Sequence, residues 1–193
     1  VNDHKDSPEY SVAKDAEEYY AKRNVTISKY QKYLTDTTGR NIPDIWSANY
    51  KLTHGFFRRF VIQQTQYVLS NGVTFQEADT SKKLGNTFDY QLQKLAKKAL
   101  VDGVSYGYWN HDHLEVFSFV ETGAEAGFVP ITDEITGELR AGIRFWSVSG
   151  TDRWTLYEED GYTEFVRKKG GEMEVLQQKK AYISRVKTTR LHG

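Results

Sequence analysis

The densest cluster of groups able to do chemistry is His111-Asp112-His113, where two imidazoles flank a carboxylate. These groups are common zinc ligands, and a closed zinc site needs four of them. Neighbouring side chains in an extended chain point to opposite faces, so one ion would need ligands from elsewhere. Because Asn and Asp favour turns, we interpret residues 110–113 as a hairpin connection rather than a metal site.

Paired carboxylates offer a second chemistry, glycoside hydrolysis, which needs two carboxyl groups at a fixed separation. Glu115, Glu121 and Glu125 lie close in sequence, within a stretch of residues 101–160 that holds 12 acidic and 3 basic residues. So many acids produce such groupings by chance, and nothing in the pattern fixes a distance. His54, beside Gly55, is better interpreted as a packed or exposed histidine than as a general base.

Other catalytic signatures are absent from the sequence. There is no phosphate-binding Walker pattern, no G-x-G-x-x-G, no G-x-S-x-G and no H-E-x-x-H. The chain has no cysteine, which excludes disulfides and thiolate chemistry. We therefore predict no catalytic residue, no cofactor and no metal.

Charge is balanced overall, with 26 basic and 26 acidic residues, but it is distributed in blocks. An acidic middle lies between two mildly basic ends. Such blocks usually form solvated faces, although they also suit head-to-tail contact between neighbouring subunits. The zero balance argues against sequence-specific DNA recognition, while transient contact with a nucleic-acid backbone stays open.

Three basic residues stand out within an amphipathic pattern that predicts a helix over residues 49–69. Its apolar positions recur every four residues, which predicts a central helix about 30 Å long on which the domain is built. Lys51, Arg58 and Arg59 have no acidic residue beside them in this helix. Their partners must lie on another element, another chain or a polyanion, so we predict a subunit-contact role for them.

The elements that would position these residues fall into two groups. Residues 1–10 are predicted to be a loose terminus, and helices are predicted over 11–24 with Ser11 as the cap, 26–34 and 87–101. The lysines of the last helix, Lys94, Lys97 and Lys98, are interpreted as a solvated face. Residues 73–75 are predicted to be a strand or linker. From residue 104 the period changes to two, which predicts strands over 104–109, 115–119, 139–148, 153–157, 163–166, 174–176 and 181–186.

Helices first and strands afterwards indicate an α+β fold, with the N-terminal helices packed on an antiparallel meander sheet. We divide the chain into a flexible terminus (1–10), a helical part (11–103) and a β part (104–193) of one domain.

The order of several short motifs resembles a known family, the portal or head–tail connector proteins of tailed bacteriophages, in the branch from siphophages of Gram-positive hosts. The motifs are residues 16–20 with Asn24 and Ile27, residues 49–51 with Phe56, Phe60, Val61 and 67–73, residues 99–103 with 106–108, residues 129–131, residues 141–146, and Leu156-Tyr157. The likeness runs from Ser11 almost to the end.

The resemblance implies a non-enzymatic subunit of a ring, commonly of twelve copies, at one capsid vertex. Double-stranded DNA would pass non-specifically through the ring, and the partners would be a terminase motor, capsid and scaffold proteins, and head-completion proteins. The location would be the virion, and the host cytoplasm during assembly. The chain is expected to be the wing portion of a longer polypeptide.

Two other function classes stay open from the residues alone. Tyr106, Tyr108 and Trp109 would suit a carbohydrate- or peptide-binding module, unless their rings form the core. An unrecognised hydrolase using the acidic strands is the other alternative.

Overall fold

A computed structural model describes residues 1–76, 80, 83–110, 112–123 and 125–182. Within these residues the helices are α1 (Asn2–Lys5), α2 (Pro8–Tyr20), α3 (Val25–Lys29), α4 (Phe56–Leu69) and α6 (Phe88–Asp102). A small sheet pairs β1 (Tyr33–Thr35) with β2 (Asn41–Pro43). The main sheet contains β3 (Ser105–Asn110), β4 (His113–Ser118), β5 (Gly127–Thr132), β6 (Leu139–Val148), β7 (Thr151–Glu158), β8 (Gly161–Lys168) and β9 (Glu174–Lys180).

The main sheet follows chain order from β3 to β9, so it is a meander. Neighbouring strands are antiparallel, except that β4 and β5 meet through one parallel pair, Ser118 with Gly127. Pro130 in β5 cannot donate a ladder hydrogen bond. That loss is tolerated because β4 pairs with β5 only at Gly127, the first residue of β5. The predicted α+β class is confirmed.

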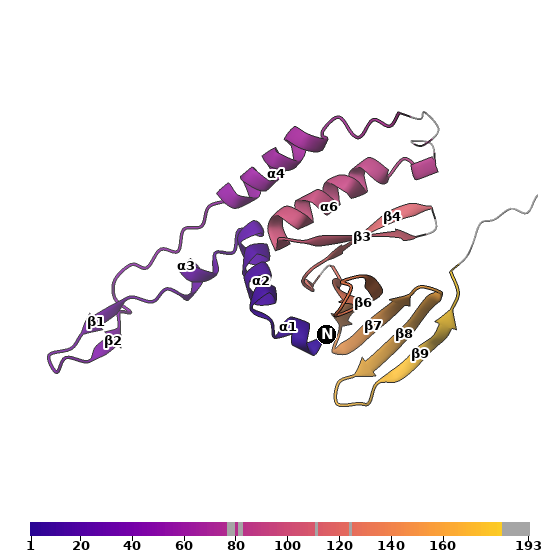
Figure 1. Cartoon of the computed structure of the whole chain (residues 1–193). Helices are drawn as coiled ribbons and strands as arrows, with labels where there is room; N and C mark the ends of the chain where they lie inside the picture. The colour runs from indigo at the N-terminus through magenta and orange to yellow at the C-terminus, as the bar shows by residue number, and fades with distance from the viewer. Residues whose placement is uncertain (77–79, 81–82, 111, 124, 183–193) are drawn as a thin grey trace, which may run out of the picture.

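The helix predicted to be central packs mainly against other helices. α6 packs on β3 and β4, whereas α4 packs on α6 and α2, on the side of α6 away from the sheet (Figure 1). α4 also starts at Phe56 instead of Asn49, with Gly55 at its N-cap. Thr53, His54 and Gly55 are poor helix formers, which explains the later start. The helix that joins the layers is therefore α6.

Residues 30–55 form an extended arm instead of the predicted helical ends. Figure 1 shows the β1–β2 hairpin at the far end of this arm, away from the main sheet. The helix predicted over 26–34 is limited to α3. Asn24 caps its start by accepting a hydrogen bond from the Ile27 amide, and the backbone turns extended at Tyr30. β1 then begins at Tyr33.

The N-terminus also carries more structure than predicted. Ser7, and not Ser11, caps α2, since its hydroxyl accepts a hydrogen bond from the Tyr10 amide, and Pro8 occupies the first turn. Both residue types are favoured in these positions. Residues 2–5 form α1, and Tyr10 is buried. Part of the segment expected to be loose is thus helical and packed.

The remaining boundaries agree more closely. α6 starts one residue after the predicted position and ends at Gly103, whose φ of 85° favours glycine. Residues 73–75 form no strand, so the linker alternative holds. Of the strand predicted over 181–186, residues 181 and 182 are not in a strand, and 183–186 lie outside the described residues.

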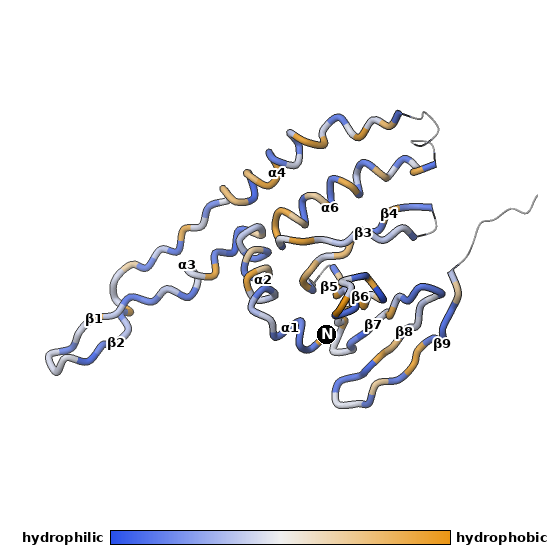
Figure 2. The backbone as a smooth tube through the Cα atoms, viewed as in Figure 1, coloured by the Kyte–Doolittle hydropathy of each residue, from blue (hydrophilic) through white to orange (hydrophobic). Residues whose placement is uncertain are grey.

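The core lies where α2 meets the inner face of the sheet. Tyr10 and Ala13 pack there with Val120 and Phe145, and Trp154 lines the edge. Figure 2 shows the apolar residues of α6 alternating with hydrophilic ones, as an amphipathic helix between two layers requires. The same figure shows apolar residues recurring along α4, although only Val61 and Thr65 of that helix are buried.

The packing around Phe145 gives a first testable prediction. A Cβ atom at Gly127 would lie 2.4 Å from Cζ of Phe145, which is only 1% exposed. Gly127→Ala is therefore expected to lower the free energy of unfolding by about 1–3 kcal/mol, measured by urea denaturation. Gly123→Ala is the control, because its Cβ would meet nothing within 4 Å. Equal stability of the two variants would contradict the prediction.

Candidate subunit-contact site

The first turn of α4 concentrates positive charge. Arg58 and Arg59 lie there, no acidic residue accompanies them, and Gly55 provides no side-chain cap. A helix N-terminus already carries a partial positive charge, so two arginines at this end are unfavourable unless an anion approaches. This local arrangement makes the surface a candidate contact site.

A hollow of about 450 Å³ opens beside this turn, lined by Lys22, His54, Gly55, Phe56, Arg58, Arg59 and Ile62. We call it the basic hollow. Lys22 enters it from the turn after α2, with a left-handed φ of 64°. The guanidinium of Arg58 lies 5.5 Å from the ring centroid of Tyr20, which orients it. Among the described residues, Arg59 and Lys22 form no ion pair.

The three predicted contact residues do not form one cluster. Arg58 and Arg59 share the basic hollow, whereas the ammonium of Lys51 donates a hydrogen bond to the Ser28 carbonyl at 2.5 Å. Lys51 therefore holds the arm against α3. Sequence reasoning missed Lys22, since a residue that reaches α4 from another element leaves no periodic signal.

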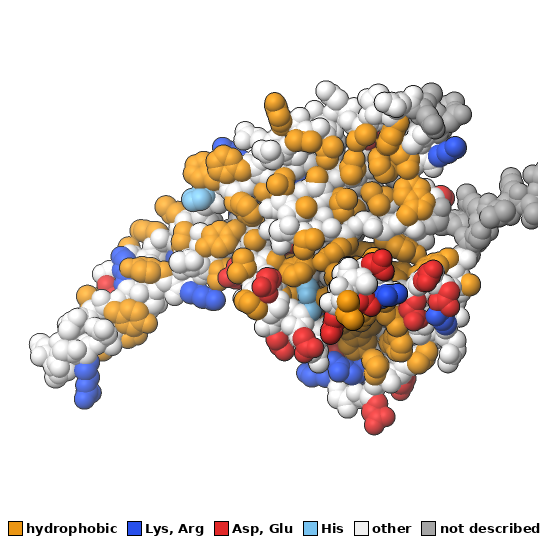
Figure 3. Space-filling model, in the orientation of Figure 1, with side chains coloured by type: hydrophobic (Ala, Val, Ile, Leu, Met, Phe, Trp, Pro, Cys, Tyr) orange, Lys and Arg blue, Asp and Glu red, His pale blue; other side chains and the backbone are white. Residues whose placement is uncertain are grey.

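A large apolar surface extends from the basic hollow along the arm and along α4. Trp46 is 77% exposed, and the other exposed members are Ile45, Tyr50, Leu52, Phe56, Phe60, Tyr67 and Val68. Figure 3 shows hydrophobic side chains gathered over α4 and the segment leading into it. Contiguous exposed apolar surface of this kind marks interaction sites in soluble proteins.

A partly buried ion cluster joins two helices to the segment that follows β4. Nζ of Lys98 in α6 lies 2.5 Å from Oε1 of Glu17 in α2 and 2.5 Å from Oε2 of Glu125, which follows β4. Lys94 adds a contact of 3.2 Å to Glu125. Burial alone would lower the pKa of Lys98, but the hydrogen bonds to both glutamates outweigh it and raise that pKa. The lysine face predicted to be solvated is thus partly buried.

Asp102 lies beside this cluster and forms no ion pair with any residue that the structure describes. It is 8% exposed, its Oδ2 accepts a hydrogen bond from the Ser118 hydroxyl, and its Oδ1 has no hydrogen-bond partner among the described residues. Burial, with a smaller contribution from Glu17, raises the pKa of Asp102 to about 7, against the opposing effects of Ser118 and Lys98. Desolvation disfavours the ionised carboxylate.

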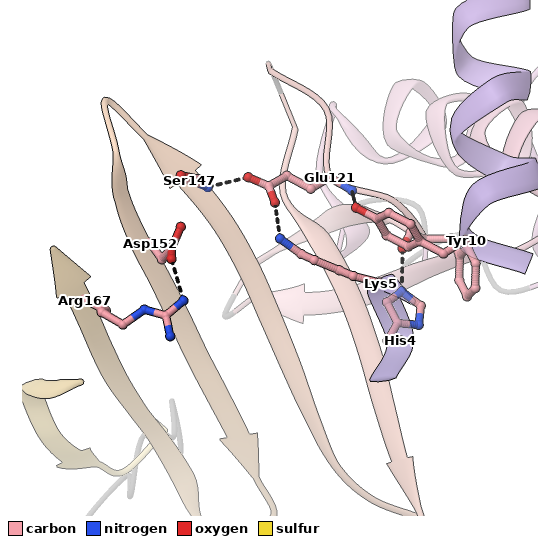
Figure 4. A network of polar contacts seen from close by, with 8 residues as sticks. His4, Lys5, Tyr10, Glu121, Ser147, Asp152 and Arg167 are labelled. Atoms are coloured by element: carbon pink, nitrogen blue, oxygen red, sulfur yellow. Dashed lines mark hydrogen bonds and ion pairs between the residues drawn. The ribbon is translucent and has the colours of Figure 1, made fainter. Parts of the chain in front are cut away.

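A second polar network fixes the N-terminus to the sheet (Figure 4). The ring nitrogen Nε2 of His4 lies 2.9 Å from the Phe119 carbonyl oxygen, and Lys5 pairs with Glu121 at 2.7 Å. Glu121 also accepts a hydrogen bond from the Ser147 amide, while its own amide donates to the Tyr10 hydroxyl. Burial lowers the pKa of His4, which favours the neutral ring.

The glutamates considered for hydrolysis therefore have other partners. Glu121 and Glu125 belong to the two networks above, and Glu115 accepts a hydrogen bond from Asn110 at 2.6 Å. His113 pairs with Asp112 at 2.9 Å, and His111 lies outside the described residues. Among the residues that are described, no group of three or more His, Cys, Asp or Glu side chains is arranged to hold a metal ion.

The aromatic strands form a hollow of about 580 Å³ on the sheet, lined partly by Tyr106, Tyr108, Phe117, Phe128, Tyr157 and Tyr182. Their rings mostly contact one another, as between Tyr108 and Tyr157 at 4.7 Å. Burial raises the pKa of Tyr108 to about 12. These rings therefore serve largely as packing partners for each other.

Comparison with known proteins defines the class. The family model described as "Phage portal protein, SPP1 Gp6-like" matches residues 2–190. Since the match covers almost the whole sequence, the chain belongs to this family of phage portal proteins, which are structural proteins.

A particular relative agrees with the family match. The portal protein of Bacillus phage SPP1 is 24% identical over 152 residues, which are 76% of this chain and 30% of that protein. The chain thus spans about a third of the length of this relative. Within the part of the chain that the structure describes, no helix has both the length and the apolar content to cross a membrane.

Proposed function

We propose that this chain is the wing portion of a subunit of the phage portal ring at the capsid vertex. Residues 11–103 supply the helical part of the wing and residues 104–193 the β part, with the N-terminal residues anchored to the sheet. The observation that supports this most strongly is the family match over residues 2–190. The length of the relative from phage SPP1 supports a longer polypeptide around these 193 residues.

In this proposal the ring, of twelve copies as is common for portals, conducts double-stranded DNA during packaging and ejection and provides the head–tail attachment site. Its partners are the terminase motor, capsid and scaffold proteins, and head-completion proteins. It works in the virion and assembles in the host cytoplasm. Electron microscopy of the complete portal polypeptide is the test: annular particles are expected, and turnover of a substrate by the chain alone would contradict a passive role.

Subunit contact is assigned to the surface around Arg58 and Arg59, with Lys51 supporting the arm. The support is the positive charge of the basic hollow, which has no ion-pair partner among the described residues, together with the apolar surface beside it. A head-to-tail ring repeats one heterologous interface, so a patch on one flank meets a different patch on the next copy.

Charge reversal tests this assignment. Arg58→Glu combined with Arg59→Glu is expected to reduce ring yield at least about tenfold, because like charges across an interface cost several kcal/mol. Ring yield is measured by electron microscopy and sedimentation. Lys168→Glu with Lys169→Glu is the matched control, since it changes the same charge at the end of β8. Unchanged ring formation in the arginine variant would count against the contact role.

A further inference from the structure

The connection between β5 and β6 presents an unusual combination of side chains. Residues 133–138 form a turn, here called the acidic loop, that carries Asp133, Glu134 and Glu138. Ile135 is 95% exposed near its tip, and Leu139 at its end is also exposed. An isoleucine held in water between carboxylates has almost no packing partner among the described residues.

The acidic loop is held in shape by its own first residue. The Asp133 carboxylate accepts hydrogen bonds from the amides of Ile135 and Thr136, at 2.9 and 3.0 Å, and pairs with Arg140 at 3.1 Å. These bonds lower the pKa of Asp133. Glu134 and Glu138 form no ion pair with any described residue. The loop is therefore a preformed apolar projection with two carboxylates still available.

The basic hollow is the chemical complement of this projection. It offers the cations Lys22, Arg58 and Arg59 around apolar groups of Phe56 and Ile62, and its described lining includes no acidic residue. Its volume of about 450 Å³ accommodates an aliphatic side chain with flanking carboxylates. Arginine beside an aromatic ring in a pocket is the composition found where binding energy concentrates at interfaces.

The two surfaces lie on separate parts of the chain. α4 packs on the side of α6 that faces away from the main sheet, and the acidic loop belongs to that sheet (Figure 1). A projection and a hollow on different parts of one molecule define a heterologous contact, which generates a ring when its rotation closes.

We propose that the acidic loop of one copy docks into the basic hollow of the next copy, with Ile135 between Phe56 and Ile62 and with Glu134 and Glu138 facing Arg58 and Arg59. This inference rests on the proposed ring function and names the partner surface of its contact site. The occupant is a second copy of this chain.

Cysteine cross-linking tests the pairing directly, because the chain contains no cysteine of its own. Two singly substituted forms of the complete portal polypeptide, Ile135→Cys and Ile62→Cys, are mixed during assembly and oxidised. A disulfide between the two forms is expected. The matched control pairs Ile135→Cys with Met173→Cys, an exposed position between β8 and β9, and is expected to give at least about tenfold less product.

A charge exchange provides the second readout. Glu134→Arg with Glu138→Arg is expected to abolish assembly with unsubstituted copies, as is Arg58→Glu with Arg59→Glu. Combining both pairs of changes in one polypeptide should restore it, since each contact then regains opposite charges. Rings that form without the Ile135–Ile62 disulfide, or without rescue, would overturn the docking while leaving the ring function intact. A failure of the ring function would instead appear as unsubstituted protein that forms no annular particles.

Discussion

Lys98→Met is expected to lower the free energy of unfolding by about 3–5 kcal/mol, because it leaves two glutamates partly buried without their shared cation. Lys98 lies between Glu17 and Glu125 at 2.5 Å from each, and its side chain is 14% exposed. Methionine preserves the length and the apolar contacts of the lysine stem, so the charge is the main change. For a chain of this size the melting temperature should fall by about 6–20 °C, measured by calorimetry or circular dichroism.

Lys97→Met is the matched control for this prediction. Lys97 is the preceding residue of α6 and forms no ion pair among the described residues. Its replacement should change stability by no more than about 0.5 kcal/mol. If both variants melted at the same temperature, the ion cluster would not be what joins α2 and α6 to the segment that follows β4.

The strands and α6 could be predicted because local signals agree there. A period of two and glycine-containing turns such as Ser149-Gly150 fix β6 to β8, which closely match the expected ranges. The period of two did not indicate β5, because this strand contains Pro130 and shows no clean alternation. The family resemblance alone singled out residues 129–131.

The position of α4 could not be predicted, since periodicity shows that a helix has an apolar face but not what covers it. The pattern from Leu52 to Val68 is strongly amphipathic, yet most of that face is exposed in the single chain. We interpret this exposed apolar surface as one that packs against partners outside these residues. The same limit explains why Lys51 was grouped with Arg58 although their side chains have separate partners.

The ion cluster was missed for a different reason. Lys98 and Glu17 are 81 positions apart, and no local pattern distinguishes Lys98 from Lys97. The interpretation of the lysines as a solvated face follows the usual behaviour of such clusters. It fails at Lys98 because α2 crosses α6 at that residue, and this crossing depends on the tertiary fold.

Asp102→Asn is expected to stabilise the protein at pH 8 and to have a smaller effect at pH 4. The pKa of Asp102 is raised from 3.8 to about 7 in the folded state, so between these pH values the folded state binds a proton that the unfolded state has released. The contribution of Asp102 to stability therefore falls as pH rises from about 4 to about 7. Asparagine does not titrate, and it can still accept the Ser118 hydrogen bond.

The gain at pH 8 should be about 2–4 kcal/mol, since one pKa unit corresponds to about 1.4 kcal/mol. The measurement is the free energy of unfolding in urea at pH 4 to 8. His4, whose pKa is lowered from 6.5, gives an opposite slope in part of this range, but it is present in both proteins and cancels in their difference. Asp152→Asn is the control, because its partly exposed pair with Arg167 should contribute no more than about 1 kcal/mol. Parallel stability curves for Asp102→Asn and the unsubstituted protein would contradict the prediction, because they would show that Asp102 has the same pKa in the folded and unfolded states.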